Sequence, residues 1–424
     1  LGHVFNYWKY DDGKIYRMRG WVWNDPRYSL SFDVNTLYMR YDVLKELGYP
    51  KLSRDKSLNS IITIDEYMNI LNQVRQKHPE MTPVLMDGWF AAYTMLASTG
   101  MSDIGDAVWE NGQAKYIFDS KDTAWAIQWL NKLYLDGYVE KGFATLSKEQ
   151  FQALASSGKV FSTLGRFEGL PEARSSLSAE TDEKRLAMFY LTKDATVKHV
   201  GINGYYIDGD DSVFITTKAK DPVGIMKFFD WCNTEDGLVL LNAGVEGLSW
   251  NWKDNRRVPT DKAMKAYYLW DSTLLKELGL GTWNGFLPSL AGMDKTGNAY
   301  DINQQATFES NKWGQYDMTD WKFFANPNYA SEKVAFIDSV KQKDAYDANS
   351  KIQAYLRDRI TKAIAAPSAA DSASQWKDTY AMMKADGLDA LNAAKNENWL
   401  KAAKFLNKQP VDLLKDVAVI GASD

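Results

Sequence analysis

The chain has 424 residues, of which 45% are hydrophobic and 25% are charged, a composition that excludes a disordered protein. A single hydrophobic core stops growing at roughly 250–300 residues, so this length predicts more than one lobe. The formal net charge of -5 argues against nucleic acid as a partner, because phosphate binding needs a basic surface. No segment approaches the ~20 consecutive apolar residues of a membrane-spanning helix. The one cysteine, Cys232, has no partner for an internal disulfide.

The first half of the chain predicts short strands that alternate with amphipathic helices. Turn residues, apolar alternation and capping boxes mark where these elements begin and end. In chain order we expect a turn at 12–13, a short strand at 14–16, a strand within 28–39, a helix at 41–48, a helix from the capping box at Thr63, a helix capped by Ser120, a helix from the capping box at Ser147 and a strand at 159–164.

The second half of the chain continues the same mixture. The pattern predicts a strand at 212–217, and Asp221-Pro222 predicts the start of the next helix. Two amphipathic helices are expected near 348–365 and 374–386, with a small-residue connector between them. The tail at 401–424 has no clear pattern. This order of strands and helices predicts α/β lobes.

Aromatic residues are abundant, with 16 Trp, 23 Tyr and 18 Phe. Many tryptophans lie in polar segments, among them Trp21, Trp250 and Trp283. A pyranose has an apolar C–H face that packs on an indole ring, and a rim of hydroxyls that hydrogen-bond to polar side chains. The aromatic composition therefore indicates carbohydrate binding.

Several short motifs follow one another across most of residues 11–392. They are DGKIY at 12–16, YMRYDVLKELG at 38–48, TIDEY at 63–67, the segment 151–167, TTKAKDP at 216–222 with KFFDW at 227–231, GVEG at 244–247 and the C-terminal helix at 376–391. Their order resembles the extracellular solute-binding proteins of carbohydrate ABC importers, in the branch that includes maltose-binding-like proteins and the larger Gram-positive lipoproteins.

The resemblance implies an α/β, two-lobed, periplasmic-binding-protein-like (type II) fold with a hinge and an interlobe cleft. Lobe one is expected to hold residues 1–21 and 214–257, and lobe two residues 22–213 and 258–424. Members of the family carry several βα units before the DGKIY motif, and a signal peptide with a lipid-modified cysteine. We therefore expect the first lobe to be incomplete here, and the full-length form to be an extracellular or periplasmic lipoprotein.

The resemblance also implies a function without catalysis. An oligosaccharide binds in the cleft, the lobes close on it, and the protein, a monomer, delivers it to the membrane permease subunits of the importer. The expected ligand-binding residues are Trp21, Trp23, Arg27, Trp89, Phe90, Arg166, Phe167, Glu246, Trp250 and Trp283. The alternative role is hinge packing for Trp21, Trp23 and Arg27, core packing for Trp89, Phe90 and the later tryptophans, and holding the turn for Glu246. A uronate ligand would call for Arg27 or Arg166 as a bidentate partner.

Other chemistries have weaker support in the sequence. The three histidines are widely spaced, and HExxH, CxxC, GxSxG and P-loop motifs are absent, which argues against zinc and nucleotide enzymes. A glycoside hydrolase or lyase stays the alternative, because it needs only two carboxylates at a set separation. Residues 208–211, or Asp294 with Asn298, Asp301 and Asn303, form acidic turns that a calcium ion could use, but neither has EF-hand spacing. We expect neither a cofactor nor a metal ion.

Overall fold

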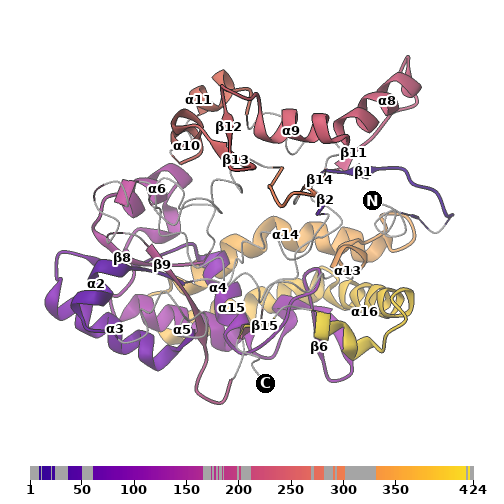
Figure 1. Cartoon of the computed structure of the whole chain (residues 1–424). Helices are drawn as coiled ribbons and strands as arrows, with labels where there is room; N and C mark the ends of the chain where they lie inside the picture. The colour runs from indigo at the N-terminus through magenta and orange to yellow at the C-terminus, as the bar shows by residue number, and fades with distance from the viewer. Residues whose placement is uncertain are drawn as a thin grey trace. The chain divides into compact units, whose positions relative to one another are not determined.

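Most of the chain is described by a computed structural model, shown in Figure 1. The described residues are 9–10, 12–20, 22–23, 37–49, 61–165, 173, 176–177, 180, 184, 186–197, 200–201, 212–268, 272–280, 290–291, 294–300, 331–416 and 419–420.

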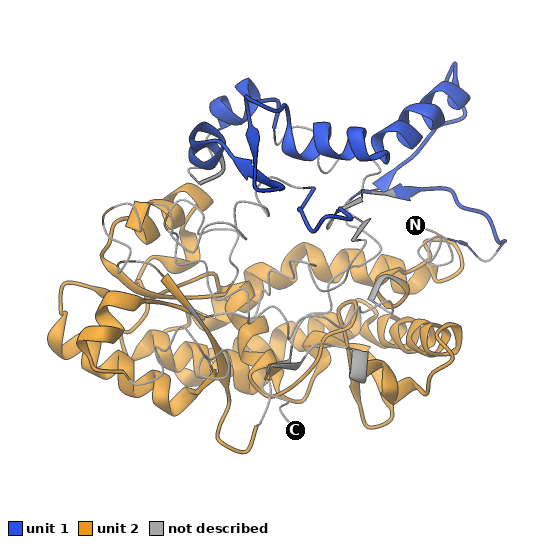
Figure 2. Ribbon diagram, viewed as in Figure 1, with its two compact units in different colours: residues 1–30, 205–329 blue, residues 31–204, 330–424 orange. Residues whose placement is uncertain are grey.

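The chain divides into two compact units, coloured separately in Figure 2. Unit 1 comprises residues 1–30 and 205–329, and unit 2 comprises residues 31–204 and 330–424. Residues 258–329 therefore belong to unit 1, whereas the expected lobe boundaries place them in lobe two. The role of the units as hinged lobes stays a prediction.

Unit 2 is built on a mixed five-stranded sheet. The strands lie in the spatial order β4 (Ile61–Thr63), β9 (Leu186–Thr192), β3 (Leu37–Arg40), β8 (Val160–Leu164) and β5 (Thr82–Met86). The central strand β3 runs antiparallel to both of its neighbours, while β5 is parallel to β8 and β4 is parallel to β9. The carboxyl ends of β5 and β8 therefore lie side by side.

Both faces of this sheet are covered, and alternate residues of a strand enter different hydrophobic clusters. In β3, Leu37 and Met39 belong to the main core, while Tyr38 belongs to a second cluster on the other face. In β5, Met86 belongs to the main core and Leu85 to the second cluster. Side chains in a strand alternate between faces, so a strand buried on both sides reads as a continuous apolar run.

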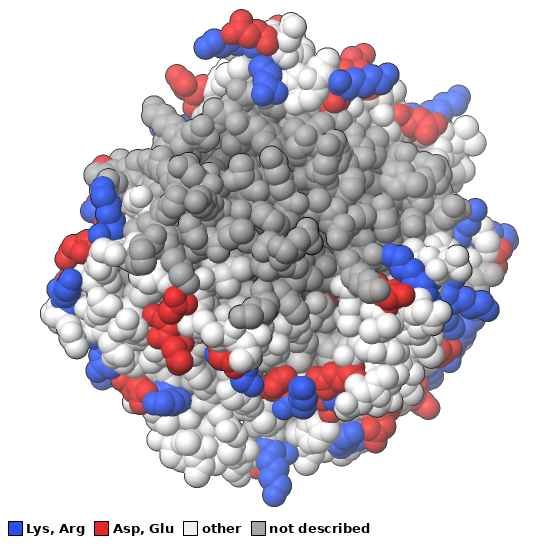
Figure 3. All heavy atoms as spheres, turned by 60° about the horizontal axis from the view of Figure 1, so that its bottom comes forward, with Lys and Arg blue, Asp and Glu red and all other residues white. Residues whose placement is uncertain are grey.

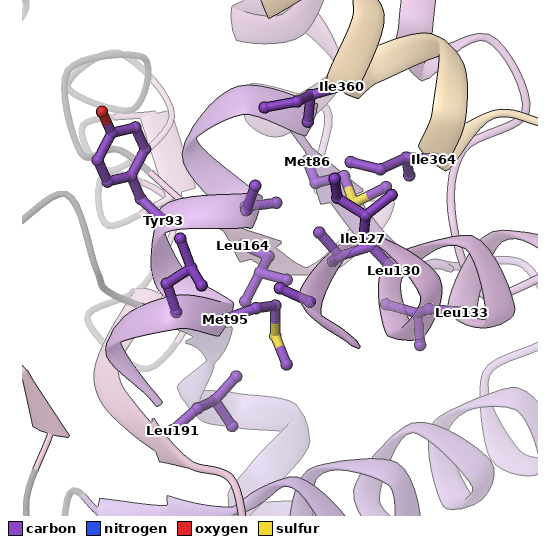
Figure 4. Close-up of a cluster of buried hydrophobic side chains, with 14 of the residues drawn as sticks. Met86, Tyr93, Met95, Ile127, Leu130, Leu133, Leu164, Leu191, Ile360 and Ile364 are labelled. Atoms are coloured by element: carbon purple, nitrogen blue, oxygen red, sulfur yellow. The ribbon is translucent and has the colours of Figure 1, made fainter. Parts of the chain in front are cut away.

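Helices supply the rest of the main core of unit 2. Figure 4 shows side chains from α4, α5 and α14 meeting those of the sheet, with Met95, Ile127 and Ile360 among the labelled residues. The described helices of unit 2 are α2 (Tyr41–Glu46), α3 (Ile64–Lys77), α4 (Gly88–Ala97), α5 (Thr123–Leu135), α6 (Lys148–Ser156), α13 (Ser331–Ala335), α14 (Lys343–Ile364), α15 (Ala369–Ala385) and α16 (Leu388–Phe405), with short 3-10 turns η3 (Ile117–Asp119), η4 (Phe143–Thr145) and η9 (Pro410–Asp416).

Two smaller pairings complete the described strands of unit 2. The hairpin of β6 (Ala107–Glu110) and β7 (Gln113–Tyr116) is antiparallel. Strands β10 (Val200–Gly201) and β15 (Val419–Ile420) also pair antiparallel, so a segment near the C-terminus joins the middle of the chain.

The capping boxes predicted at Thr63 and Ser147 are confirmed, each with both reciprocal hydrogen bonds. The cap predicted at Ser120 is wrong. Helix α5 begins three residues later with Asp122 as its N-cap residue, and the Ser120 hydroxyl donates instead to Glu110 at 2.9 Å. The C-terminal helices are longer than predicted. Helix α15 begins at Ala369 because the Ser368 side chain accepts the backbone N–H of Asp371, and α16 occupies the start of the tail that had no assignment.

Unit 1 has short strand pairs and four described helices. Strand β1 (Met18–Arg19) pairs antiparallel with β11 (Ser212–Val213), β2 (Val22–Trp23) pairs parallel with β14 (Leu290–Ala291), and β12 (Trp250–Lys253) forms a hairpin with β13 (Arg256–Pro259). The helices are α8 (Pro222–Cys232), α9 (Glu235–Ala243), α10 (Asp261–Tyr268) and α11 (Ser272–Glu277). The strand predicted at 14–16 is wrong, since those residues are not in a strand and β1 begins at Met18, and the strand predicted at 212–217 is confined to β11.

Local sequence accounts for two features of unit 1. Asp221 caps α8 through a hydrogen bond from Gly224 N–H (2.8 Å), with proline in the first turn, as predicted. Asp254 and Asn255 both have positive φ, of 51° and 60°, in the β12–β13 turn. Such turns match the twist of paired strands, and Asp and Asn tolerate this backbone region better than most residues.

Candidate functional site

The carboxyl ends of β5 and β8 form the best-defined candidate site in unit 2. Met86 pairs with Leu164 at the ends of the two parallel strands. Asp87 follows β5 directly, and Gly165 follows β8. In open α/β sheets, ligands bind outside the carboxyl ends of the strands. Residues that follow these two strands are therefore placed where a ligand is expected.

Asp87 is the N-cap of α4 and also an ion-pair partner. Its Oδ1 accepts the backbone N–H of Trp89 at 3.0 Å and that of Phe90 at 3.4 Å. Its Oδ2 lies 2.5 Å from Nη2 of Arg357, which comes from α14. One carboxylate thus satisfies the start of α4 and holds a cation from a helix 270 residues further along the chain.

Arg357 lies over an aromatic ring as well as beside Asp87. Its guanidinium carbon is 5.5 Å from the centroid of the Phe90 ring, within the range of a cation–π contact. The Arg357 side chain is 59% exposed and that of Asp87 31% exposed. The group therefore combines an aromatic ring, a cation and an anion at a surface that a ligand can reach.

Two glycines bring these residues together. A Cβ built on Gly88 would lie 3.0 Å from the Oγ1 of Thr361 and 3.3 Å from its Cα, so a side chain at position 88 would crowd the contact between α4 and α14. Arg357 is one helical turn before Thr361, and this close approach is what carries it to Asp87. Gly165 has a φ of +113°, and a Cβ there would lie 2.9 Å from the Cβ of Phe90.

The expected pair Trp89 and Phe90 has two different environments. The Trp89 ring packs into the main core, 4.7 Å from the ring of Phe118 and 5.3 Å from that of Tyr93. Phe90 instead contacts Arg357 and the turn at Gly165. Of the two rings, Phe90 belongs to the candidate site, whereas Trp89 packs against the main core of unit 2.

The second expected cluster, in unit 1, is also divided between core and surface. Trp250 is only 5% exposed, lies in the hydrophobic core of unit 1 and donates its Nε1–H to the carbonyl of Gly244 at 3.3 Å. Trp252, 49% exposed, meets the Trp250 ring edge-on at 5.3 Å. Glu246 is exposed in the preceding turn. The surface groups of this hairpin are therefore Trp252 and Glu246.

A buried ion pair lies behind the same hairpin. Arg257 and Asp294 are 3.0 Å apart, with side chains 2% and 1% exposed. The Arg257 guanidinium also lies 5.4 Å from the Trp250 ring centroid and 5.6 Å from that of Trp252. Burial raises the pKa of Asp294, but hydrogen bonds from Thr296 and Asn298 and the charge of Arg257 outweigh it, so the pKa lies below its usual value.

This pair bears on the calcium alternative at the 294–303 turn. Asp294 Oδ1 accepts the Thr296 N–H, the Thr296 hydroxyl and the Asn298 N–H, all within 2.9 Å, and Oδ2 accepts Arg257. The carboxylate is thus committed to internal partners. Across the described residues, no group of three or more His, Cys, Asp or Glu side chains is arranged to hold a metal ion. Asp301, Asn303 and residues 208–211 lie outside the described residues.

Several expected site residues fall outside what the structure describes. Trp23 lies in β2, next to β14, but its side chain is not among the described ones. The other expected site residues that lie outside the described part of the chain are Trp21, Arg27, Arg166, Phe167 and Trp283. Arg166 and Phe167 follow Gly165 directly in sequence.

Sequence reasoning missed Arg357, which has no local motif to identify it. The available signal was at Asp87-Gly88, where a capping residue and a glycine follow a buried strand.

The surface agrees with the argument from net charge against a nucleic-acid partner. On the face in Figure 3, the described Lys and Arg side chains are interspersed with Asp and Glu. No described helix is long and apolar enough to span a membrane.

Comparison with known proteins gives the fold. No protein-family model and no curated protein matches the sequence. Among solved structures, alginate-binding protein AlgQ2 without calcium is 16% identical, with 94% of this chain and 77% of that chain covered and a TM-score of 0.61. A solute-binding protein of Bifidobacterium longum infantis, associated with an HMO-binding ABC transporter, is 14% identical, with 96% and 80% covered and a TM-score of 0.63.

A third similar structure is the S. pneumoniae ABC-transporter substrate-binding protein FusA, an EF-hand mutant in complex with fructo-nystose. It is 13% identical, with 96% of this chain and 79% of that chain covered and a TM-score of 0.66. The chain therefore has the α/β fold of the solute-binding proteins of ABC transporters, which confirms the resemblance at the level of fold. At these identities the likeness defines the fold, and the ligand has to be argued from the residues.

Proposed function

We propose that this protein binds an extracellular oligosaccharide and delivers it to the membrane permease subunits of an ABC importer, without chemical change to the sugar. The fold supports this proposal, because the similar structures are named as an alginate-binding protein and as solute- or substrate-binding proteins associated with ABC transporters. The lipid anchor of the full-length form and the monomeric state are part of the same proposal.

The observation that carries the proposal is the group of Asp87, Phe90 and Arg357 at the carboxyl edge of β5 and β8. Sugars are bound by aromatic rings together with side chains that donate and accept hydrogen bonds to hydroxyls. This edge supplies all three kinds of group on rigid secondary structure. Exposed Trp252 and Glu246 in unit 1 are a second set with the same chemistry.

Ligand binding is expected to favour a closed form of the protein, which the transporter then recognises. A fall in the radius of gyration on adding the sugar, measured by small-angle X-ray scattering, would show this closure. An unchanged radius at saturating sugar would instead favour a glycan-binding module without transport closure.

The decisive experiment is a thermal-shift screen against neutral and acidic oligosaccharides, followed by calorimetry and recovery of the sugar. A ligand at a hundred times its dissociation constant adds about 2.7 kcal/mol of stability. A sugar that stabilises the protein and is recovered intact supports the proposal. A cleaved sugar would move the assignment to the glycoside hydrolase or lyase alternative. No shift with any glycan, from a folded sample, would reject the proposed function.

A further inference from the structure

The Arg357–Asp87 pair has a consequence for the class of sugar. We propose that these two side chains together bind neighbouring hydroxyl groups of a neutral sugar, and that they select against sugars that carry a carboxylate. This inference rests on the proposed function and goes further, because it names the substrate class and the residues that set it.

The pair matches a vicinal diol in both polarity and reach. Arg357 presents five N–H donors, and the ion pair with Asp87 engages Nη2. Asp87 accepts three hydrogen bonds, while an ionised carboxylate has about four lone-pair sites. A hydroxyl both donates and accepts, so one hydroxyl can accept from Arg357 while its neighbour donates to Asp87. Both side chains are partly exposed, which leaves them within reach of solvent and ligand.

A carboxylated sugar fits the same pair poorly. An arginine that recognises a carboxylate does so with two parallel N–H groups, and here Nη2 already donates to Asp87, whose negative charge offsets that of the guanidinium. The incoming carboxylate would stand beside the charge of Asp87, and like charges in contact are unfavourable. The discrimination therefore comes from Asp87 as much as from Arg357.

The pair is also held in place before any ligand arrives. Asp87 is fixed by two backbone N–H groups of α4, and the guanidinium of Arg357 is held over the Phe90 ring. Gly88 fixes the spacing of the two helices. A prearranged group loses less conformational freedom on binding and so gives more affinity for the same contacts.

The test uses matched hexasaccharides that share one linkage and stereochemistry and differ in whether each sugar unit carries a primary alcohol or a carboxylate. Mannohexaose with hexamannuronate is one such pair, and gluco and galacto pairs complete the panel. Calorimetry on the wild-type chain is expected to show tighter binding of the neutral member. Equal or tighter binding of the uronate member would overturn the inference while leaving oligosaccharide binding in place.

Variants then assign the selection to the pair. Arg357→Ala is expected to weaken the neutral sugar by about tenfold, the usual effect of losing a hydrogen bond to a charged group. Asp87→Asn keeps a capping oxygen but removes the negative charge. It is therefore expected to reduce the ratio of the affinity for the neutral hexasaccharide to the affinity for the uronate one. Lys362→Ala, which breaks an exposed pair with Asp358 on the same helix, is the matched control and should change neither affinity.

The outcomes separate this inference from the proposed function. Neutral-sugar binding that survives Arg357→Ala unchanged, or a preference that survives Asp87→Asn unchanged, would reject the role of the pair alone. Absence of binding to every hexasaccharide, with a folded wild-type chain by circular dichroism, would reject the proposed function and this inference with it.

Discussion

Arg257 and Asp294 form an ion pair of 3.0 Å inside unit 1, with almost no exposure of either side chain. Breaking such a pair leaves a charge buried without compensation, which typically costs about 3–5 kcal/mol. We therefore expect Asp294→Ala to lower the free energy of unfolding by about that amount, measured by urea denaturation with circular dichroism.

The control for this prediction is Glu277→Ala, which removes the exposed ion pair of Lys262 and Glu277 in the same unit. Exposed pairs contribute about 0–1 kcal/mol. The double change Arg257→Met with Asp294→Leu should recover part of the loss, because apolar side chains replace buried charges well. An Asp294→Ala protein as stable as the control would contradict the structural role of the pair.

Helix α16 protects the edge of a β-hairpin through two asparagines one turn apart. Asn392 Oδ1 accepts the backbone N–H of Tyr116 at 2.8 Å, and Asn396 Oδ1 accepts that of Ala114 at 2.9 Å. Edge strands are exposed to mispairing unless they are covered. Asn392→Ala should cost about 1–3 kcal/mol, since it leaves an N–H group without its acceptor.

Hydrogen exchange measures this contact directly. The Tyr116 amide should exchange faster in Asn392→Ala, while the Ala114 amide keeps its protection because Asn396 is intact. The reverse pattern is expected for Asn396→Ala. Unchanged protection of Tyr116 in the first variant would show that another group covers the strand.

The fold was predictable where the signal was local. The capping boxes at Thr63 and Ser147 define the starts of α3 and α6, because the capping residue and its partner are three residues apart. The start of α5 was not predictable from Ser120, because the Ser120 hydroxyl donates a hydrogen bond to Glu110 of the β6–β7 hairpin. Helix α16 was missed because small, charged and apolar residues alternate in it without a wide apolar face, and its burial comes from contacts on several sides.

The candidate site was predictable only in part, for a related reason. Phe90 could be predicted from its place after a buried strand. Arg357 could not, since its contact with Asp87 joins residues 270 positions apart and depends on how α14 packs on α4. Trp250 shows the converse: its polar neighbours in sequence suggest exposure, but Arg257 and the core of unit 1 enclose its ring. A pattern gives residue type and spacing, and packing decides which aromatic ring reaches solvent.

A buried acid in unit 2 makes its stability depend on pH. Burial raises the pKa of the Asp103 carboxyl well above its usual value, the charge of Asp106 raises it further, and Lys395 opposes both. Tyr93 and Tyr116 face the same group of charges. A raised pKa means that the folded protein holds the proton more tightly than the unfolded chain does. The stabilisation that comes from this tighter proton binding is therefore complete below the pKa of an unfolded Asp, about 3.9. It is lost as the pH rises through the pKa of Asp103 in the folded protein.

Asp103→Asn tests this dependence, because an amide of the same shape has no charge to bury. Its stability relative to wild type should increase as the pH is raised from about 5 to 8, the range above the unfolded pKa. Urea denaturation at several pH values gives this difference. A constant offset between the two proteins would show that the Asp103 carboxyl does not titrate as its surroundings require.

Gly88 sets the distance between α4 and α14, and a side chain there should disturb both stability and ligand binding. A Cβ at this position would meet Thr361 at 3.0 Å from Oγ1 and 3.3 Å from Cα. Forcing extra atoms into a packed contact typically costs about 1–3 kcal/mol. Gly88→Ala should therefore lower the free energy of unfolding by about 1–3 kcal/mol and move Arg357 away from Asp87.

Gly142→Ala is the matched control, because a Cβ there has no neighbour within 4 Å and its φ of -89° suits any residue. Adding Thr361→Ala to Gly88→Ala should restore only part of the stability, since the contact with the backbone Cα remains. If Gly88→Ala were as stable as Gly142→Ala, the contact between position 88 and Thr361 would not limit how closely the two helices pack.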